Sequence, residues 1–360
     1  MSFEWGSKKV LVTGGASFIG STIVDQILAK GAAGVRVVDD FSSGFRSNIQ
    51  RHIDAGSVEL VEGDLRDPAV SARAVAGRDV IFHLAADHGG RGYVDLHQYA
   101  CSTNLGLDAT LFNAALEARV ETVTYASSGC IYPLYLQADV GETLYLTEDM
   151  AGAPGYDPDG MYGLAKLAGE LTLKALHEER GLRTGSCRYF TVYGPRGVEN
   201  HAVIAMIARG FLRQDPFHVW GNGEQIRNWT YVDDIASGTI AIAENIEDGQ
   251  AVNLGTMERV RVIDAVRMAI DFTQAHDASY APEIVLQPEM PTGPMNRVAD
   301  NALAKKLLDW EPQTNFAEGL RATADWYFST KDPDKVRAIF DHMLTGRGDP
   351  APESVSAASA

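Results

Sequence analysis

The chain has 360 residues, of which 45% are hydrophobic and 22% are charged, and this composition is typical of a folded globular protein. Its formal net charge of −17 at pH 7 argues against nucleic acid or an anionic membrane surface as the main partner. No apolar run approaches the ~18 residues of a membrane-spanning helix, and the first residues contain no signal-peptide pattern, so we expect a cytoplasmic protein.

Short β-rich runs alternate with helical stretches through the first 190 residues. The predicted strands are 9–14, 34–40, 58–64, 79–86, 121–128 and 184–194, and the predicted helices are 20–30, about 99–118 and 161–180. This alternation predicts an α/β fold with a doubly wound parallel sheet of the Rossmann type. The nearly continuous apolar run "DVIFHLAA" fits a sheet that is covered on both faces.

The pattern becomes irregular after Pro195, where "DPFHVWGNGEQ" and "PEMPTGPMNR" are predicted to be long loops. We expect a smaller mixed α/β lobe there, formed by about 191–225 and 267–345, which would bind the substrate. The sheet domain then comprises 1–190 and about 226–266, with "NWTYVDD" (228–234) returning to the sheet. The small polar residues of 347–360 predict a disordered tail.

The three cysteines, Cys101, Cys130 and Cys187, are far apart and odd in number, so no disulfide framework is expected. No cluster of cysteine and histidine has the spacing of metal ligands, and no metal site is expected.

A glycine-rich turn, "VLVTGGASFIGS", follows the first predicted strand and opens the first helix. Glycine lets the backbone approach a pyrophosphate closely at a helix N-terminus. The spacing is Gly14-x-x-Ser17-x-x-Gly20, so a serine, whose hydroxyl could donate to phosphate, replaces the usual middle glycine. Asp39 ends the second strand, where a carboxylate accepts from a ribose 2′-hydroxyl and repels a 2′-phosphate. The domain therefore is expected to bind NAD rather than NADP.

Tyr162 and Lys166 of "MYGLAK" lie four residues apart on one face of a predicted helix. The pKa of a free phenol, ~10, is too high for a base near neutrality. A neighbouring ammonium group and a cationic nicotinamide both favour the phenolate, so the pair can act as an acid/base.

The ordered motifs "VTGGASFIGS", "VVDDFSSG", "EGDLRD", "IFHLAA", "YGLAK", "RYFTVYGPRG", "GNGEQIRNWTYVDD" and "AVNLG" resemble an extended short-chain dehydrogenase/reductase of the nucleotide-sugar epimerase and dehydratase branch, from about residue 8 to 330. The resemblance implies that Tyr162 removes the proton of a sugar C4 hydroxyl while hydride passes to NAD. Ser128 would bond the reacting hydroxyl, and Lys166 would hold the nicotinamide ribose. The expected NAD-binding residues are Gly14, Ser17, Phe18, Ile19, Gly20, Asp39, Asp64, Leu65, Leu84, Ala85, Ala86, Tyr162 and Lys166.

"SSGCIYP" (127–133) decides between members of this branch. The 4,6-dehydratases resemble one another in a threonine, aspartate and glutamate triplet that here reads Ser128-Gly129-Cys130, so dehydration lacks its acid. A thiolate at Cys130 can remove a proton from carbon. "SSGCIYP" and "AADHGGRG" resemble the GDP-mannose 3,5-epimerases, which pair this cysteine with a lysine acid. "PRGVENHAV" has no lysine, and His201 would take that role. The alternative is a cysteine that packs as a small hydrophobic residue.

The substrate would lie between the loop after the fourth strand and the second lobe. Arg227 and Arg297 match the diphosphate contacts of the resembled family, and bidentate arginine suits a diphosphate. Asp300 would accept from the nucleotide ribose. Asn104 would lie near the active site, or be a buried amide bonded only to backbone. The expected substrate-binding residues are Gly90, Arg91, Asn104, Ser128, Tyr189, Thr191, Trp220, Arg227, Arg297 and Asp300.

The sequence therefore predicts an NAD-dependent nucleotide-sugar epimerase with a transient 4-keto intermediate, in which Cys130 deprotonates C3 or C5. The alternatives are a UDP-glucose or UDP-glucuronate 4-epimerase in which Cys130 takes no part, and a net NAD-dependent oxidoreductase. The resemblance also implies a homodimer that forms through the helix containing "YGLAK".

Overall fold

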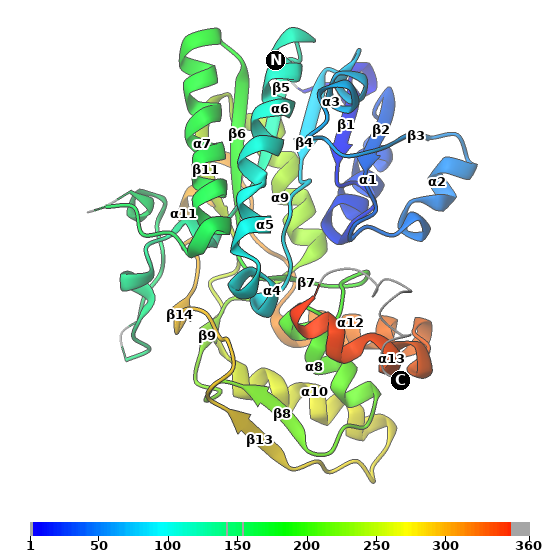
Figure 1. The fold of residues 1–360 in the computed structure, drawn as a ribbon, viewed down its shortest axis with the longest axis vertical. Helices are drawn as coiled ribbons and strands as arrows, with labels where there is room; N and C mark the ends of the chain where they lie inside the picture. Colours follow the sequence, from blue (N-terminus) through cyan, green and yellow to red (C-terminus); the bar gives the residue numbers. More distant parts are fainter. Residues whose placement is uncertain (1–2, 142, 153–154, 347–360) are drawn as a thin grey trace, which may run out of the picture.

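The computed structural model describes residues 3–141, 143–152 and 155–346 (Figure 1). The tail expected to be disordered, 347–360, lies outside the described residues. No helix in the described part of the chain is long and apolar enough to cross a membrane.

A seven-stranded parallel sheet forms the larger part of the molecule, in the order β11-β6-β5-β4-β1-β2-β3 (Figure 1). Its strands are β1 (Lys9–Thr13), β2 (Gly34–Asp39), β3 (Val58–Glu62), β4 (Val80–His83), β5 (Thr122–Ser128), β6 (Arg183–Tyr189) and β11 (Asp248–Leu254). Successive side chains point to opposite faces, so Val10 and Val12 pack in one core cluster and Leu11 in another. The expected Rossmann-type sheet, apolar on both faces, is confirmed.

The chain returns to the sheet later than expected. Residues 228–234 were predicted to return, but β10 (Thr230–Tyr231) pairs instead with β7 (Val192–Tyr193), which lies beyond the end of β6. The strand that joins the main sheet is β11, beside β6. That prediction was wrong: only Thr230 and Tyr231 of this segment form a strand, and helix α9 (Val232–Asn245) begins directly after them.

Helices cover both faces of the sheet (Figure 1). On one face α9 packs against α1 (Phe18–Ala29) and α11 (Ala302–Leu308). On the other, α6 (Asn104–Glu117) packs against α3 (Pro68–Val75) and α7 (Gly160–Arg180). The short helices α2 (Gln50–Asp54), α4 (Arg91–Leu96) and α5 (Gln98–Ser102) lie in the connections.

A smaller lobe has its own hydrophobic core, which includes Phe217, Trp229 and Phe316. It contains α8 (Ala202–Phe211), α10 (Val262–His276), α12 (Phe316–Thr330), α13 (Pro333–Thr345), the parallel pair β8 (Phe217–Trp220) and β13 (Ile284–Gln287), and the three short strands β12 (Val260–Arg261), β9 (Ile226–Arg227) and β14 (Asn296–Arg297). A cavity lined by the ends of β5 and β6 and by residues of this lobe separates the two parts. This is where a doubly wound sheet binds its ligands.

Candidate active site

The glycine-rich turn brings the start of α1 close to the end of β1. Gly14 has a positive φ of 63°, and a Cβ at Gly20 would lie 2.2 Å from the Gly14 carbonyl oxygen, so only glycine fits there. Ser17 takes an extended conformation that any residue adopts, and its hydroxyl donates to the Gly14 carbonyl at 2.5 Å. The hydroxyl thus stabilises the turn, and the backbone N–H groups at the start of α1 remain the phosphate donors.

Asp39 anchors this turn to β2. Its carboxylate accepts from the backbone N–H groups of Ala16 and Phe41, each at 2.9 Å. A small cavity of about 60 Å³ lies beside it, lined also by Gly14, Leu65 and Ala85. Asp64 lines the same cavity and pairs with Arg66 at 2.7 Å, which lowers the pKa of Asp64. A glycine turn, a strand-end carboxylate and the small cavity beside them together fit the adenosine half of NAD.

A larger cavity of about 380 Å³ begins at the same turn, since Ser17, Leu84 and Ala86 line both cavities. Most residues predicted to bind NAD or substrate line the larger cavity: Ser17, Phe18, Ile19, Leu84, Ala86, Gly90, Arg91, Ser128, Cys130, Tyr162, Lys166, Tyr189, Thr191, His201, Trp220, Arg227 and Arg297. The cavities therefore form a crevice that runs from Asp39 to the predicted acid/base.

Tyr162 and Lys166 lie one turn apart near the start of α7. Burial raises the pKa of Tyr162 and the nearby Cys130 raises it further, whereas a hydrogen bond with Ser128 lowers it. The Lys166 ammonium lies 5.9 Å from the centre of the Tyr162 ring and 4.6 Å from that of Tyr125. Because burial favours the neutral phenol, Tyr162 can lose its proton only with the positive charge of Lys166 and a cationic nicotinamide beside it.

A buried chain of hydrogen bonds lies beneath Lys166. Thr13 Oγ1 contacts His83 Nδ1 at 2.8 Å, His83 Nε2 contacts Asp108 Oδ1 at 3.0 Å, and the Tyr125 hydroxyl donates to Asp108 Oδ2 at 2.6 Å. Burial lowers the pKa of Lys166, and the negative charges of Asp108 and Glu170 oppose that effect. The Asp108 carboxylate therefore helps to keep the buried lysine charged.

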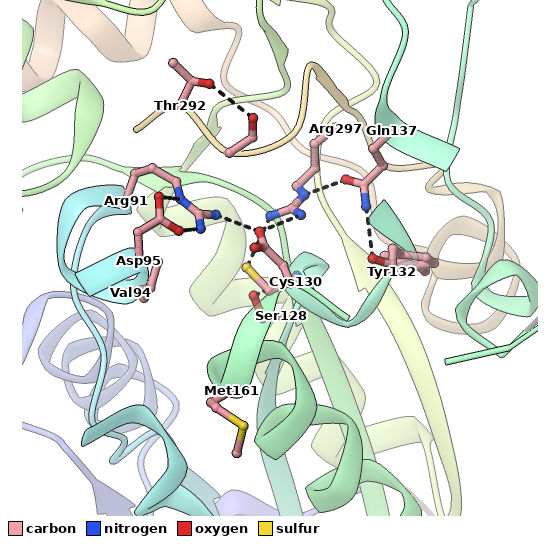
Figure 2. Close-up of polar contacts among 12 residues, drawn as sticks. Arg91, Val94, Asp95, Ser128, Cys130, Tyr132, Gln137, Met161, Thr292 and Arg297 are labelled. Carbon is pink, nitrogen blue, oxygen red and sulfur yellow. Dashed lines mark hydrogen bonds and ion pairs between the residues drawn. The ribbon is translucent and has the colours of Figure 1, made fainter. Parts of the chain in front are cut away.

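Cys130 follows β5 in a short 3₁₀ helix, Gly129–Ile131, and is partly exposed, whereas Cys101 and Cys187 are buried. Its backbone N–H donates to Ser128 Oγ at 3.1 Å. Figure 2 shows its sulfur beside the guanidinium of Arg297, whose Nη1 lies 3.2 Å from Sγ. Arg297 also donates to Asp159 at 3.0 Å and to Gln137 at 2.7 Å, and Asp159 binds Arg91 at 2.7 Å.

The loop after β4 is held in place from two sides. Asn104 bonds the backbone of Asp87, accepting from its N–H at 2.6 Å and donating to its carbonyl at 2.9 Å. Asn104 is fully buried and lines neither cavity, so the structure supports the alternative of an amide bonded only to backbone. Across the loop, a Cβ at Gly90 would lie 1.6 Å from the Asn200 carbonyl oxygen. This loop thus has little freedom beside the cavity.

His201 lies at the N-terminus of α8, with its ring 6.2 Å from that of His88 and 6.3 Å from that of Phe18. The ring of His88 lies in turn 6.3 Å from that of Tyr162. Burial lowers the pKa of His201 to about 4, so its imidazole is neutral at pH 7. A neutral imidazole is a weak proton donor, which counts against the predicted role as acid.

Arg227 provides a positive charge that is not neutralised within the described part of the protein. It donates to the carbonyls of Ile226 and Thr292, each at 2.8 Å, and no carboxylate there lies within ion-pair distance. Burial lowers its pKa to about 9, and the charges of Arg297 and Arg91 add to this effect. An anionic ligand such as a diphosphate would relieve this repulsion. Asp300, by contrast, accepts from Ala302 N–H at 2.8 Å and does not line the cavity.

The sequence did not indicate several polar residues that line the cavity or support it. Asp159 and Gln137 hold Arg297, but neither belongs to a recognisable motif. Several residues that line the cavity also have a buried polar atom without a hydrogen-bond partner in the described residues: Asn200 Oδ1, Arg209 Nε, His218 Nδ1, Gln225 Oε1 and Trp229 Nε1. No cluster of three or more potential metal ligands occurs within the described ranges.

Fold and site define a Rossmann-type enzyme that binds a dinucleotide and positions a tyrosine–lysine pair beside it. The model of the NAD dependent epimerase/dehydratase family matches residues 10–255, and the chain belongs to this family. It is 28% identical to GDP-mannose 3,5-epimerase of Arabidopsis thaliana over 341 residues, which cover 92% of this chain and 86% of that protein. It is 30% identical to UDP-glucose 4-epimerase of Mycolicibacterium smegmatis over 331 residues, covering 89% and 98%.

Among solved structures, UDP-glucose 4-epimerase of Thermus thermophilus in complex with NAD is similar, with a TM-score of 0.78 and 28% identity. The match covers 90% of this chain and all of that one (100%). The residues of the glycine turn and the strand-end Asp39 fit the cofactor of the family, and the chain is an NAD-dependent enzyme.

Proposed function

We propose that the chain is a nucleotide-diphosphate-sugar epimerase that acts through a transient C4 ketone, and that Cys130 removes the proton from C3 or C5. The observation that carries this proposal is the position of the Cys130 sulfur, in the cavity that also holds Ser128 and Tyr162. A thiol at that point would face a carbon next to C4, the carbon that loses hydride to NAD while Tyr162 takes the hydroxyl proton. GDP-mannose is the first substrate to test, because of the similarity to GDP-mannose 3,5-epimerase.

Each residue has a defined task in this reaction. Tyr162 takes the proton of the C4 hydroxyl, Ser128 bonds the same hydroxyl, and Lys166 supplies positive charge to the phenolate. When bound, NAD would supply the acceptor for the C4 hydride and the donor for its return. The ketone acidifies the neighbouring C–H bond, whose proton moves to Cys130 Sγ while the electron pair delocalises onto the C4 oxygen. An acid on the opposite face then returns a proton to carbon.

Two features of the cavity support a nucleotide-diphosphate sugar as substrate. Arg227 carries a partly buried positive charge that a diphosphate would neutralise. The half of the cavity formed by the smaller lobe is lined by side chains that carry polar groups, among them Arg209, Gln225 and Trp229, and this is the space proposed for the nucleobase. The relatives named above are a GDP-mannose epimerase and a UDP-glucose epimerase, so guanine and uracil are both candidates for the nucleobase of the substrate.

A UDP-sugar 4-epimerase with a silent Cys130 is the second candidate, and one observation favours it. Deprotonation beside the ketone needs an acid on the opposite face, but residues 195–201 contain no lysine. His201, the residue predicted to replace it, is neutral at pH 7. A 4-epimerase needs no such acid, because only C4 changes configuration.

Incubation with nucleotide sugars in D2O discriminates between these reactions. The full chain with NAD would be supplied in turn with GDP-mannose, UDP-glucose and UDP-glucuronate, and the products examined by NMR and mass spectrometry. We expect solvent deuterium at C3 or C5 with the preferred substrate. Cys130→Ser should lose this exchange, and Tyr162→Phe should lose it together with any epimerisation, because the ketone no longer forms.

Conversion at C4 without deuterium uptake would contradict the role of Cys130 and support the 4-epimerase. Full exchange in Cys130→Ser would remove Cys130 as the base. Net accumulation of NADH would instead identify a dehydrogenase, since an epimerase returns every hydride to its substrate.

A further inference from the structure

The Arg297 guanidinium is fixed against the Cys130 sulfur and faces it from 3.2 Å (Figure 2). Its Nε donates to Gln137 Oε1 at 2.7 Å, and its Nη2 donates to Asp159 Oδ2 at 3.0 Å. Arg297 is only 8% exposed. Three of its nitrogens are therefore occupied by three different partners, and one of these is the thiol.

The two polar partners of Arg297 are themselves held in place. The fully buried Gln137 donates through Nε2 to the carbonyls of Tyr132 and Pro133 at 3.0 and 3.1 Å. Asp159 lies at the N-terminus of α7 and also accepts from Arg91 at 2.7 Å. Because both anchors are rigid, the guanidinium has little freedom to leave the sulfur.

The family resemblance assigned Arg297 to the diphosphate of the substrate, but its contacts differ from that assignment. We propose that Arg297 is a positioning residue for Cys130, which stabilises its thiolate and holds the sulfur toward the sugar, while Arg227 remains the arginine available to the diphosphate. This inference rests on the proposed function, since it concerns the base of that reaction.

Charged and titratable groups on several elements face Cys130. Arg297 on β14 and Arg227 on β9 favour the thiolate, while Asp159 and Tyr162 on α7 do not. Asp159 shares its charge between Arg91 and Arg297, which weakens its effect on the sulfur. Burial acts to lower the pKa of Arg297, but Cys130 and Asp159 outweigh it, so the pKa is raised and the guanidinium stays charged.

The contact between Arg297 and the Cys130 sulfur also favours the oxidation of C4, which comes before the deprotonation by Cys130. Negative charge at Cys130 raises the pKa of Tyr162, which opposes loss of the phenol proton. The Arg297 guanidinium, in contact with the sulfur, reduces the effect of the thiolate on the pKa of Tyr162, so that Tyr162 and Cys130 can both act as bases in one cavity. When the C–H bond next to the ketone breaks, its proton passes to Sγ and gives a neutral thiol, and the electron pair moves toward the C4 oxygen.

Alkylation of the thiol tests this inference without substrate or turnover. Cys101 and Cys187 are both 0% exposed, so iodoacetamide should modify Cys130 alone in the folded chain, with Cys130→Ser as the blank. The rate would be followed by mass spectrometry from pH 5 to 10. In Arg297→Gln we expect the midpoint of the rate profile to rise by about one pH unit or more, and the rate at pH 7 to fall about tenfold.

Arg297→Lys should bring the midpoint part of the way back to that of the wild type, because it keeps the charge, which a merely structural role would not require. Arg227→Gln is the matched control: it removes a second, partly buried arginine of the same cavity, whose hydrogen bonds go to backbone carbonyls rather than to the sulfur. Its shift should be clearly smaller. If Arg297→Gln does not fold, Gln137→Leu, which removes one anchor of the guanidinium, should raise the midpoint by a smaller amount.

An unchanged midpoint in folded Arg297→Gln would overturn the inference, and weaker binding of GDP and UDP by that variant would then return Arg297 to the diphosphate. A raised midpoint supports it. The proposed function fails separately: if the wild type takes up no deuterium at C3 or C5 although its thiol titrates as expected, Arg297 controls a thiol that is not the base.

Discussion

His201 lies in the cavity that the proposed reaction uses, but its surroundings work against a role as a charged acid. Burial disfavours the imidazolium and lowers its pKa from 6.5 to about 4. The neighbouring rings of Phe18 and His88 supply no negative charge that would counter this. His201 is therefore not expected to act as a charged proton donor in the proposed reaction.

The low pKa of His201 makes the folded state sensitive to acid. The unfolded chain binds a proton at this histidine below pH 6.5, whereas the folded chain does so only below about pH 4, so stability is present above pH 6.5 and is lost as the pH falls toward 4. Between pH 7 and 5 this histidine should account for at most about 2 kcal/mol of lost unfolding free energy. Urea unfolding at the two pH values measures it.

His201→Gln should lose less stability than the wild type over that interval. His276→Gln, at an exposed histidine of α10, is the matched control and should behave like the wild type. Equal losses in all three proteins would mean that His201 is solvated and free to titrate normally.

At the scale of elements, the loop that follows β4 links the sheet to the side of the cavity that contains Cys130. Asn104 ties its first half to α6, and the close approach of Gly90 to Asn200 ties its second half to the segment before α8. Arg91, which begins α4, is bound to Asp159 at the start of α7. The loop thus links β4 with α6, α7 and the segment before α8, so a small displacement there should change the shape of the site.

Gly90→Ala should disturb this loop because the new Cβ would collide with the Asn200 carbonyl oxygen. We expect a fall in Tm and a loss of kcat/KM of about tenfold or more, since misplacement by about 1 Å can cost about 100-fold in rate. Gly106→Ala is the matched control: Gly106 lies in α6 with no neighbour within 4 Å of the added Cβ. It should keep activity and gain about 0.5–1 kcal/mol.

A fall in kcat/KM of similar size in Gly106→Ala would contradict the importance of the close contact at Gly90. Unchanged kinetics in Gly90→Ala would show that the loop adapts to the extra methyl group.

For the whole molecule, the faces of α6 and α7 that point away from the sheet carry apolar side chains. Leu105, Leu164 and Leu171 are 42%, 40% and 48% exposed, and the two helices pack side by side. Leu164 and Leu171 are seven residues apart and share a face of α7. The predicted homodimer would bury these side chains if it forms through these two helices.

Leu164→Glu combined with Leu171→Glu should therefore produce a monomer, because two charges would be buried in the interface. Light scattering after gel filtration gives the mass directly. Leu286→Glu, at a leucine of the smaller lobe that is 44% exposed, is the control and should leave the mass of the wild type unchanged. A monomeric wild type, or a double variant that stays dimeric, would contradict the homodimer.

The sequence alone was sufficient for the Rossmann sheet, the glycine turn and the tyrosine–lysine pair. These features depend on local patterns: runs of apolar residues, glycines at a tight turn, and a four-residue spacing on one helix. The six predicted strands lie close to β1–β6, and their order follows from right-handed parallel connections. The seventh strand was expected at 228–234, where only Thr230 and Tyr231 extend and pair with β7, whereas the strand beside β6 is β11.

Only the tertiary structure decided how the residues around Cys130 are paired. Arg297 is 167 residues from Cys130 in the sequence, and Gln137 and Asp159 lie on connections without a periodic pattern. The burial that lowers the pKa of His201 likewise depends on elements distant in the chain. Electrostatic effects of this kind act over a few ångströms and vary with local burial, so they exist only once the two parts of the molecule enclose the cavity.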